Sequence, residues 1–166
     1  MVYELREFRW GQFSPYADWF NGLNARTAAR IERYVRRMEN GDKRRILRPQ
    51  KPGGRNIRRR ERTMALTRSY KETILERLQS DEAFRNALYA EVIDALADGE
   101  VPEALSMLRD IVHATITFKG LAKKTGISEK SLHRMLGSHG NPTTQNIGKI
   151  LKTIKDHLGL QLSVAA

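Results

Sequence analysis

The spacing of apolar residues along the chain predicts a mainly helical protein. Between residues 24 and 38, Ala28, Ile31, Val35 and Met38 recur at steps of three, four and three, as they do on one face of a helix. Capping and breaking residues divide the rest of the chain in the same way. Further helices are predicted near residues 15–21, after Ser69, from Ser80 to about Asp98, from Pro102, after Thr117, from Glu129, and from Thr143 to about Leu158. Ser80 and Thr143 are predicted to cap the helices that they begin.

Two short stretches are expected to be extended. Residues 2–8 favour a strand, and residues 160–164 alternate apolar and polar side chains, which is typical of a short strand. The expected fold class is therefore mainly α: a helix-turn-helix bundle with a short C-terminal strand, preceded by an N-terminal β-α-α fragment.

Composition divides the chain into three parts. Residues 1–42 hold eight of the twelve aromatic residues, so this segment is suited to enter a core. The stretch 43–62 holds ten Lys or Arg residues and one acidic residue, with prolines and a Gly53-Gly54 pair but no aromatic residue. Such a sequence buries too little apolar surface to offset the entropy of ordering it, so 43–63 is predicted to be a flexible basic linker. The main domain is expected to span 64–166.

The net charge of +11 and the pI near 10.3 indicate a polyanionic partner. Residues 116–166 carry eight basic and two acidic side chains, whereas 63–115 carry five basic and ten acidic ones. No apolar run is long enough to cross a bilayer, no cysteine is present, and the start of the chain lacks a signal-peptide core. We therefore expect a cytoplasmic protein without a membrane partner.

Residues 118–137 have the spacing of a DNA-binding helix-turn-helix. Ala122 is small where two helices would cross, and Gly126 suits the positive φ of a short inter-helix turn. Four apolar residues are expected to point inward and hold the helices at their angle: Leu121, Ile127, Leu132 and Met135. The alternative interpretation is a two-helix corner in another kind of helical bundle.

The outer face of the second helix supplies candidate DNA contacts. Lys130 and Arg134 suit base edges or phosphates, and Ser128 can offer its hydroxyl to a phosphate. Glu129 can accept a hydrogen bond from a cytosine amino group or act as a favourable charge in the first helical turn. The complete predicted DNA-binding set is Lys119, Ser128, Glu129, Lys130, His133, Arg134, Asn141 and Thr143.

The loop before the last predicted helix has two interpretations. Asn141 and Thr143 lie in a polar stretch next to a helix start, which suits phosphate contact. The same residues suit an ordinary capped turn. Lys119 is expected to contact the DNA backbone.

The sequence gives no indication of catalysis. The four histidines lack metal-ligand spacing, and no nucleophile with a base and no Gly-rich phosphate loop is found, so no metal, cofactor or enzymatic activity is expected. Arg26, Arg30, Arg33 and Arg37 are predicted to line one helix face opposite the apolar stripe. This arginine stripe suits an RNA backbone or, more commonly, a solvated helix surface.

From Met64 onward the sequence resembles HigA-like antitoxins of addiction modules. The resemblance rests on four stretches: 64–73, Leu108-Arg109-Asp110, 132–137, and Gly140-Asn141-Pro142-Thr143. Residues 3–42 resemble the N-terminus of a RelE/ParE-type toxin, through Trp19-Phe20-Asn21-Gly22-Leu23 and the helix that carries Ala28-Ala29-Arg30-Ile31. This second likeness ends after Asp42.

The resemblance implies a type II antitoxin: a homodimeric autorepressor that binds operator DNA and neutralises a RelE/ParE-type toxin by direct contact. Acidic helices within 70–110 are complementary in charge to a basic toxin. Without the remainder of a toxin sheet, Trp19 and Phe20 would be exposed unless they dock on the antitoxin helices. Two alternatives are a toxin–antitoxin fusion with residual RNA-directed function and an interaction module that no longer binds DNA.

Overall fold

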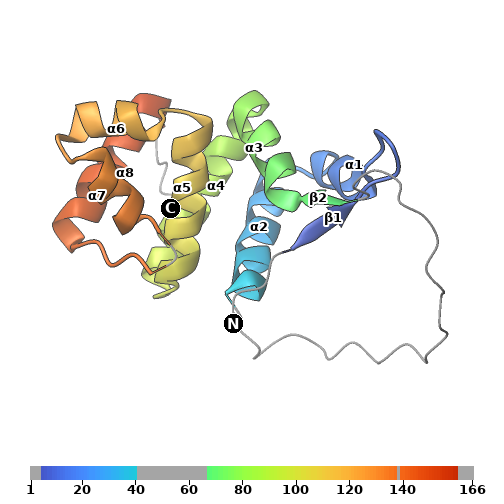
Figure 1. The fold of residues 1–166 in the computed structure, drawn as a ribbon, viewed down its shortest axis with the longest axis horizontal. Coiled ribbons are helices and arrows are strands. Elements are labelled where there is room, and N and C mark those ends of the chain that lie inside the picture. The colour runs from blue at the N-terminus through green and yellow to red at the C-terminus, as the bar shows by residue number, and fades with distance from the viewer. Residues whose placement is uncertain (1–4, 41–66, 138, 161–166) are drawn as a thin grey trace, which may run out of the picture.

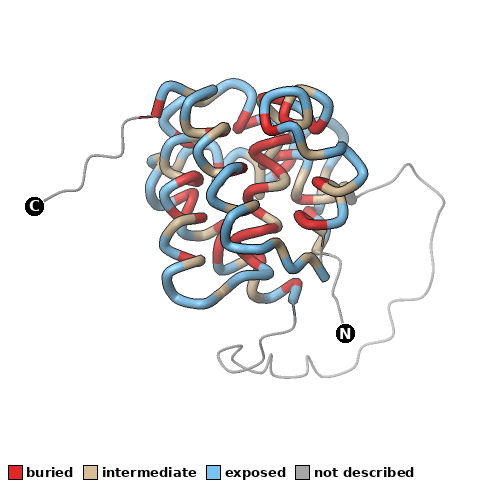
Figure 2. The backbone as a smooth tube through the Cα atoms, turned by 90° about the vertical axis from the view of Figure 1, so that its left-hand side faces the viewer, coloured by how far each residue is buried: buried red, intermediate tan, exposed pale blue. Residues whose placement is uncertain are grey.

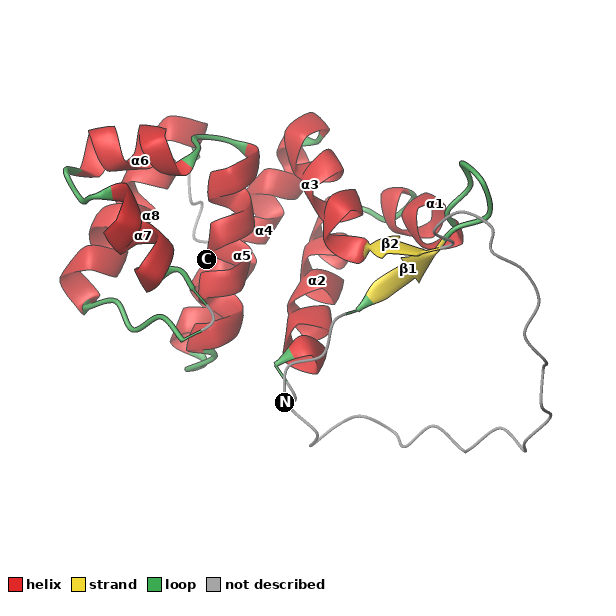
Figure 3. Cartoon of the chain, viewed as in Figure 1, coloured by secondary structure: helices red, strands yellow, loops and turns green. Residues whose placement is uncertain are grey.

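The computed structural model describes residues 5–40, 67–137 and 139–160 (Figure 1). These residues form a mainly helical fold, as the sequence predicted, and they also contain one small antiparallel sheet (Figure 3). In chain order the elements are β1 (Arg6–Phe8), α1 (Pro15–Asn21), α2 (Ala25–Glu39), β2 (Thr67–Ser69), α3 (Tyr70–Ser80), α4 (Glu82–Ala97), α5 (Val101–Ala114), α6 (Phe118–Thr125), α7 (Glu129–Met135) and α8 (Thr144–Leu158).

Most helix starts follow the predicted capping residues. The hydroxyl of Thr117 accepts the N–H of Gly120, and Thr143 accepts the N–H of Asn146. The prediction that Ser80 caps the fourth helix is wrong, because Ser80 ends α3. Asp81 is the cap of α4, since its carboxylate accepts the Phe84 N–H at 2.9 Å, and a charged acceptor at this position also complements the helix dipole.

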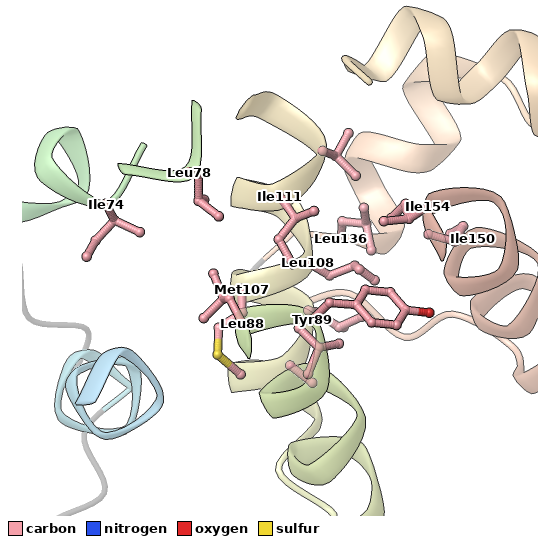
Figure 4. Close-up of a cluster of buried hydrophobic side chains, with 14 of the residues drawn as sticks. Ile74, Leu78, Leu88, Tyr89, Met107, Leu108, Ile111, Leu136, Ile150 and Ile154 are labelled. Atoms are coloured by element: carbon pink, nitrogen blue, oxygen red, sulfur yellow. The ribbon is translucent and has the colours of Figure 1, made fainter. Parts of the chain in front are cut away.

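The helices α4 and α5 lie at the centre of the described fold. Helices α2 and α3 pack on one side of this pair, and α6 to α8 lie on the other (Figure 1). Buried residues gather on the inward faces of the helices (Figure 2). Apolar side chains of α3, α4, α5 and α8 fill the centre, among them Ile74, Leu78, Leu88, Met107, Leu108, Ile111, Ile150 and Ile154 (Figure 4).

A short sheet joins two segments that are far apart in the sequence. Strand β1 pairs antiparallel with β2, with Glu7 opposite Arg68. Glu7 is buried, forms an ion pair with Arg68 and accepts a hydrogen bond from the Thr73 hydroxyl at 2.9 Å. The predicted strand at 2–8 is confirmed for residues 6–8, and β2 was not predicted. Of the predicted C-terminal strand only Leu160 lies within the described residues, and the predicted linker at 43–63 lies outside them.

The N-terminal segment shares the hydrophobic core of the rest of the fold. Phe20 is fully buried, and its ring meets that of Phe84 edge to face, with centroids 5.6 Å apart. The Arg77 guanidinium lies over both rings and donates to the carbonyls of Phe20 and Leu23. Trp19, in contrast, is 51 % exposed. The two aromatic residues therefore differ: Phe20 docks on the helices, and Trp19 does not.

Helix α2 buries charged side chains beside most of its predicted apolar stripe. Ala28 is fully buried, and Ile31 and Val35 pack partly buried against the core. Arg33 is 8 % exposed and Arg36 is 1 % exposed, whereas Met38 is 37 % exposed. For Arg33, both the RNA-binding and the solvated interpretation are wrong, because its guanidinium contacts carboxylates of α4 and of the turn before α5. Arg26 and Arg30 do lie on an exposed surface.

A buried cluster of charges surrounds Arg36. Its guanidinium forms ion pairs with Glu32 at 2.5 Å, with Glu39 at 3.5 Å and with Asp110. Glu39 also accepts a hydrogen bond from the Tyr70 hydroxyl at 2.9 Å. Burial raises the pKa of Glu32 to about 7 despite the opposing effect of Arg36, and one of its carboxylate oxygens has no hydrogen-bond partner.

The raised pKa of Glu32 predicts a pH-dependent stability. Folded protein binds a proton at Glu32 up to about pH 7, whereas the unfolded chain releases it near the ordinary value, so this group lowers stability as pH rises between these values. The Glu32→Gln variant should therefore gain roughly 2 kcal/mol relative to wild type between pH 5 and pH 8. Urea unfolding at both pH values measures this change. Parallel pH dependence of the two proteins would contradict it.

Candidate nucleic-acid interface

Helices α6 and α7 form the predicted helix-turn-helix. Gly126 ends α6 with φ of +70° and donates its N–H to the Ala122 carbonyl, and α7 begins three residues later at Glu129. Leu121 and Leu132 are fully buried and Met135 is nearly so, while Ile127 packs partly buried against them. The positions predicted to point inward are confirmed. They hold α7 across α6 and against the rest of the core.

The corner before α6 is also fixed locally. Thr117 has φ of +63°, and among the described residues it is the one non-glycine residue with a positive φ. Its N–H donates to the Val112 carbonyl at 2.8 Å, and its hydroxyl caps α6. These hydrogen bonds keep an unfavourable backbone conformation in place and set the direction in which α6 leaves α5.

The outer face of α7 carries exposed cations without partners. Lys130 and Arg134 are exposed, and neither forms an ion pair with another described residue. Ser128 is exposed but engaged, since its hydroxyl accepts the N–H of Ser131 at 3.2 Å and caps the helix. Glu129 is exposed and lies 3.7 Å from the His133 ring. This face therefore offers two free positive charges on a rigid helix.

His133 packs against other aromatic rings, which the helix-turn-helix spacing of the sequence did not indicate. Its ring stacks on Phe118 with centroids 3.8 Å apart and an interplanar angle of 17°. His113 of α5 meets the same Phe118 ring at 5.0 Å. The three rings join α5, α6 and α7, so His133 braces α7 while its side chain stays 43 % exposed. No sequence signal links these residues, since they come from three different helices.

A pocket lies between α7 and the start of α8. It has a volume of about 330 Å³ and brings together three of the predicted residues, Arg134, Asn141 and Thr143. His139 and Asn146 also line it and were not in the predicted set. The Thr143 hydroxyl caps α8, so its oxygen is already used, whereas Asn141 is exposed. The structure thus places Arg134 beside Asn141 and Thr143 in one pocket.

The other predicted residue, Lys119, lies exposed at the second position of α6. No group of His, Cys, Asp or Glu residues in the described part of the chain has the geometry of a metal site. No helix among the described residues is long and apolar enough to span a membrane.

Comparisons with known protein families, with curated proteins and with solved structures found no match for this chain.

Proposed function

We propose that this protein is a sequence-specific DNA-binding autorepressor and the antitoxin of a type II toxin–antitoxin module. The observation that carries the DNA half is the pair of unpaired, exposed cations, Lys130 and Arg134, on the outer face of α7 in a helix-turn-helix. A helix held in this way suits a major groove, where Arg and Lys read guanine edges or contact phosphates.

The remaining predicted contacts have supporting roles in this proposal. Lys119 and the pocket beside Arg134 contact the DNA backbone, with Asn141 facing a phosphate and Thr143 and Ser128 holding their helix starts. His133 sets the position of α7. Two copies in a homodimer would place two α7 helices in successive major grooves, roughly 34 Å apart. The protein acts in the cytoplasm in this proposal.

The toxin half of the proposal is supported by charge. Carboxylates gather on α4 and α5 and already bind arginines of α2, so this part of the fold accepts a basic helix. The same contacts weaken the RNA-directed alternative, because Arg33 is buried in ion pairs and Arg37 pairs with Glu100.

Removing both cations of α7 should abolish sequence preference. We expect Lys130→Ala/Arg134→Ala to lower the affinity for the preferred duplex about 100-fold, since each base contact contributes roughly 1–3 kcal/mol. The preferred duplex is first selected from random DNA with the full-length chain. Fluorescence anisotropy at several salt concentrations, with excess nonspecific DNA, then measures the affinity.

The matched control is Arg26→Ala/Arg30→Ala. It also removes two positive charges, but from α2, on the opposite side of α4 and α5 (Figure 1). This control should keep the wild-type preference. If wild type selects no sequence, or if the α7 variant selects the same one as wild type with equal affinity, the protein is an interaction module and the repressor proposal fails.

A further inference from the structure

Five carboxylates of α4, α5 and the turn between them form one surface, which we call the acidic face: Glu91, Asp98, Glu100, Glu103 and Asp110. Helix α2 covers this face with polar contacts. Arg33 lies 3.6 Å from Glu91, 2.5 Å from Asp98 and 2.8 Å from Glu100. The contacts continue along the helix: Arg37 pairs with Glu100, Asn40 donates to Glu103 at 2.9 Å, and Arg36 pairs with Asp110.

The contact between α2 and the acidic face is rich in charge pairs. Ala28 and Ala29 are fully buried where α2 meets α4, and Ala25, Ile31 and Val35 pack partly buried against the core. A polar pocket of about 230 Å³ lies at the edge of this contact, lined by residues that include Arg33, Arg37 and Glu91. Paired charges gain little net free energy from burial, because the ion pair must offset the desolvation of both partners. A contact of this kind can be exchanged for an equivalent one.

Several aromatic side chains of the N-terminal segment are not covered by the described residues. Phe8, Trp10, Phe13 and Trp19 are each more than half exposed, and Tyr34 on α2 is 48 % exposed. Nearly all the large exposed apolar side chains of the described chain lie in this segment. Such uncovered aromatic side chains are typical of a piece of a larger folded unit. In that larger unit, further residues would cover the aromatic side chains, and the arginine-bearing helix would still be presented.

We propose that the acidic face is the docking site for a separate basic protein that presents an arginine-bearing helix like α2, and that α2 occupies this site in cis. Under the proposed function, on which this inference rests, that protein is the toxin. Because α2 is tethered to its site through the chain, it competes as an intramolecular ligand at high effective concentration. The partner must displace α2, so weakening the α2 contact raises the affinity for the partner.

The test uses the full-length chain and a fluorescein-labelled peptide of residues 14–40 as the probe. Wild type should bind the peptide weakly. The variant Arg33→Glu/Arg37→Glu repels its own α2 from the acidic face and should bind the peptide at least about 10-fold more tightly, with an affinity that falls as salt rises. Fluorescence anisotropy gives the affinity, and circular dichroism shows that the variant remains helical.

Two further variants separate this effect from a general change in charge. Arg26→Glu/Lys123→Glu reverses two exposed charges away from the acidic face and should bind the peptide as weakly as wild type. Adding Glu91→Lys and Glu100→Lys to Arg33→Glu/Arg37→Glu recreates the cis ion pairs with opposite signs. This charge-swapped chain should close again and lose the gain in peptide binding.

The inference is overturned if folded Arg33→Glu/Arg37→Glu binds the peptide no more tightly than wild type, or if the charge-swapped chain binds it equally well. If the double reversal does not fold, Arg33→Gln/Arg37→Gln replaces it and should show at least a 3-fold gain, whose absence also overturns the inference. DNA binding is measured on the same proteins. Preserved sequence preference without peptide docking would refute this inference alone, whereas docking without sequence preference would refute the repressor proposal alone.

Discussion

Replacing Arg36 by methionine should destabilise the protein by about 3–5 kcal/mol, the range measured when one partner is removed from a buried ion pair. Arg36 is 1 % exposed and is the cation shared by Glu32, Glu39 and Asp110. Methionine keeps much of the volume but removes the charge and the donors. Three carboxyl groups would then lie close together with no buried cation, and they must take up protons or expose themselves to water.

Urea unfolding followed by circular dichroism measures this loss. Arg26→Met on the same helix is the matched control, because Arg26 is exposed and its replacement should change stability by less than about 0.5 kcal/mol. A loss below about 1 kcal/mol at neutral pH would show that the cluster does not hold α2 on α5.

The sequence predicted the helices well because their signals are local. Caps such as Thr117 and Thr143, and the turn at Gly126, each act within four residues. The helix-turn-helix is itself a local pattern, so its inward positions were predictable. The cap of α4 was predicted one residue too early, at Ser80. Ser80 and Asp81 are both good N-cap residues, and only the observed hydrogen bond from the Phe84 N–H to Asp81 distinguishes them.

Contacts between distant parts of the chain were not predictable in this way. The periodicity of α2 correctly predicted a helix, and Ala28, Ile31 and Val35 of its apolar stripe do pack in or against the core. It did not indicate that Arg33 and Arg36 are buried as well, because their burial depends on carboxylates more than 55 residues away, such as Glu91 and Asp110. Strand β2 also depends on a contact between distant parts of the chain. Arg68 and Ser69 have little strand preference and become extended through pairing with β1.

The candidate interface shows the same division. Arg134, Asn141 and Thr143 are close in sequence, and the structure brings them to one pocket. The stack of His133 on Phe118 and His113 depends on how three helices meet, so residue types and spacing alone could not indicate it. Charge on an exposed helix face was predictable, whereas the groups that hold this face in position were not.

The second large effect is expected at Gly140, in the loop that sets α8 and the pocket against α7. A Cβ added at Gly140 would lie 1.9 Å from the Met135 carbonyl oxygen and 2.9 Å from that of Gly137. Both are backbone atoms at the end of α7, so the loop must move as a unit. Gly140→Ala should therefore destabilise the protein by about 3 kcal/mol, the upper end of typical overpacking.

Replacing Gly148 by alanine should change the stability in the opposite direction. Gly148 lies within α8, is exposed, and has no atom within 4 Å of an added Cβ. Gly148→Ala should stabilise the protein by roughly 0.5–1 kcal/mol, because alanine loses less backbone entropy on entering a helix. Thermal and urea unfolding of the two variants gives the comparison, and equal effects would mean that the contact between Gly140 and Met135 does not restrict the loop.

In DNA binding, Gly140→Ala should weaken sequence-specific affinity even in the fraction that remains folded, since displacing the loop moves Asn141 and Thr143 away from Arg134. Gly148→Ala should bind DNA as wild type does.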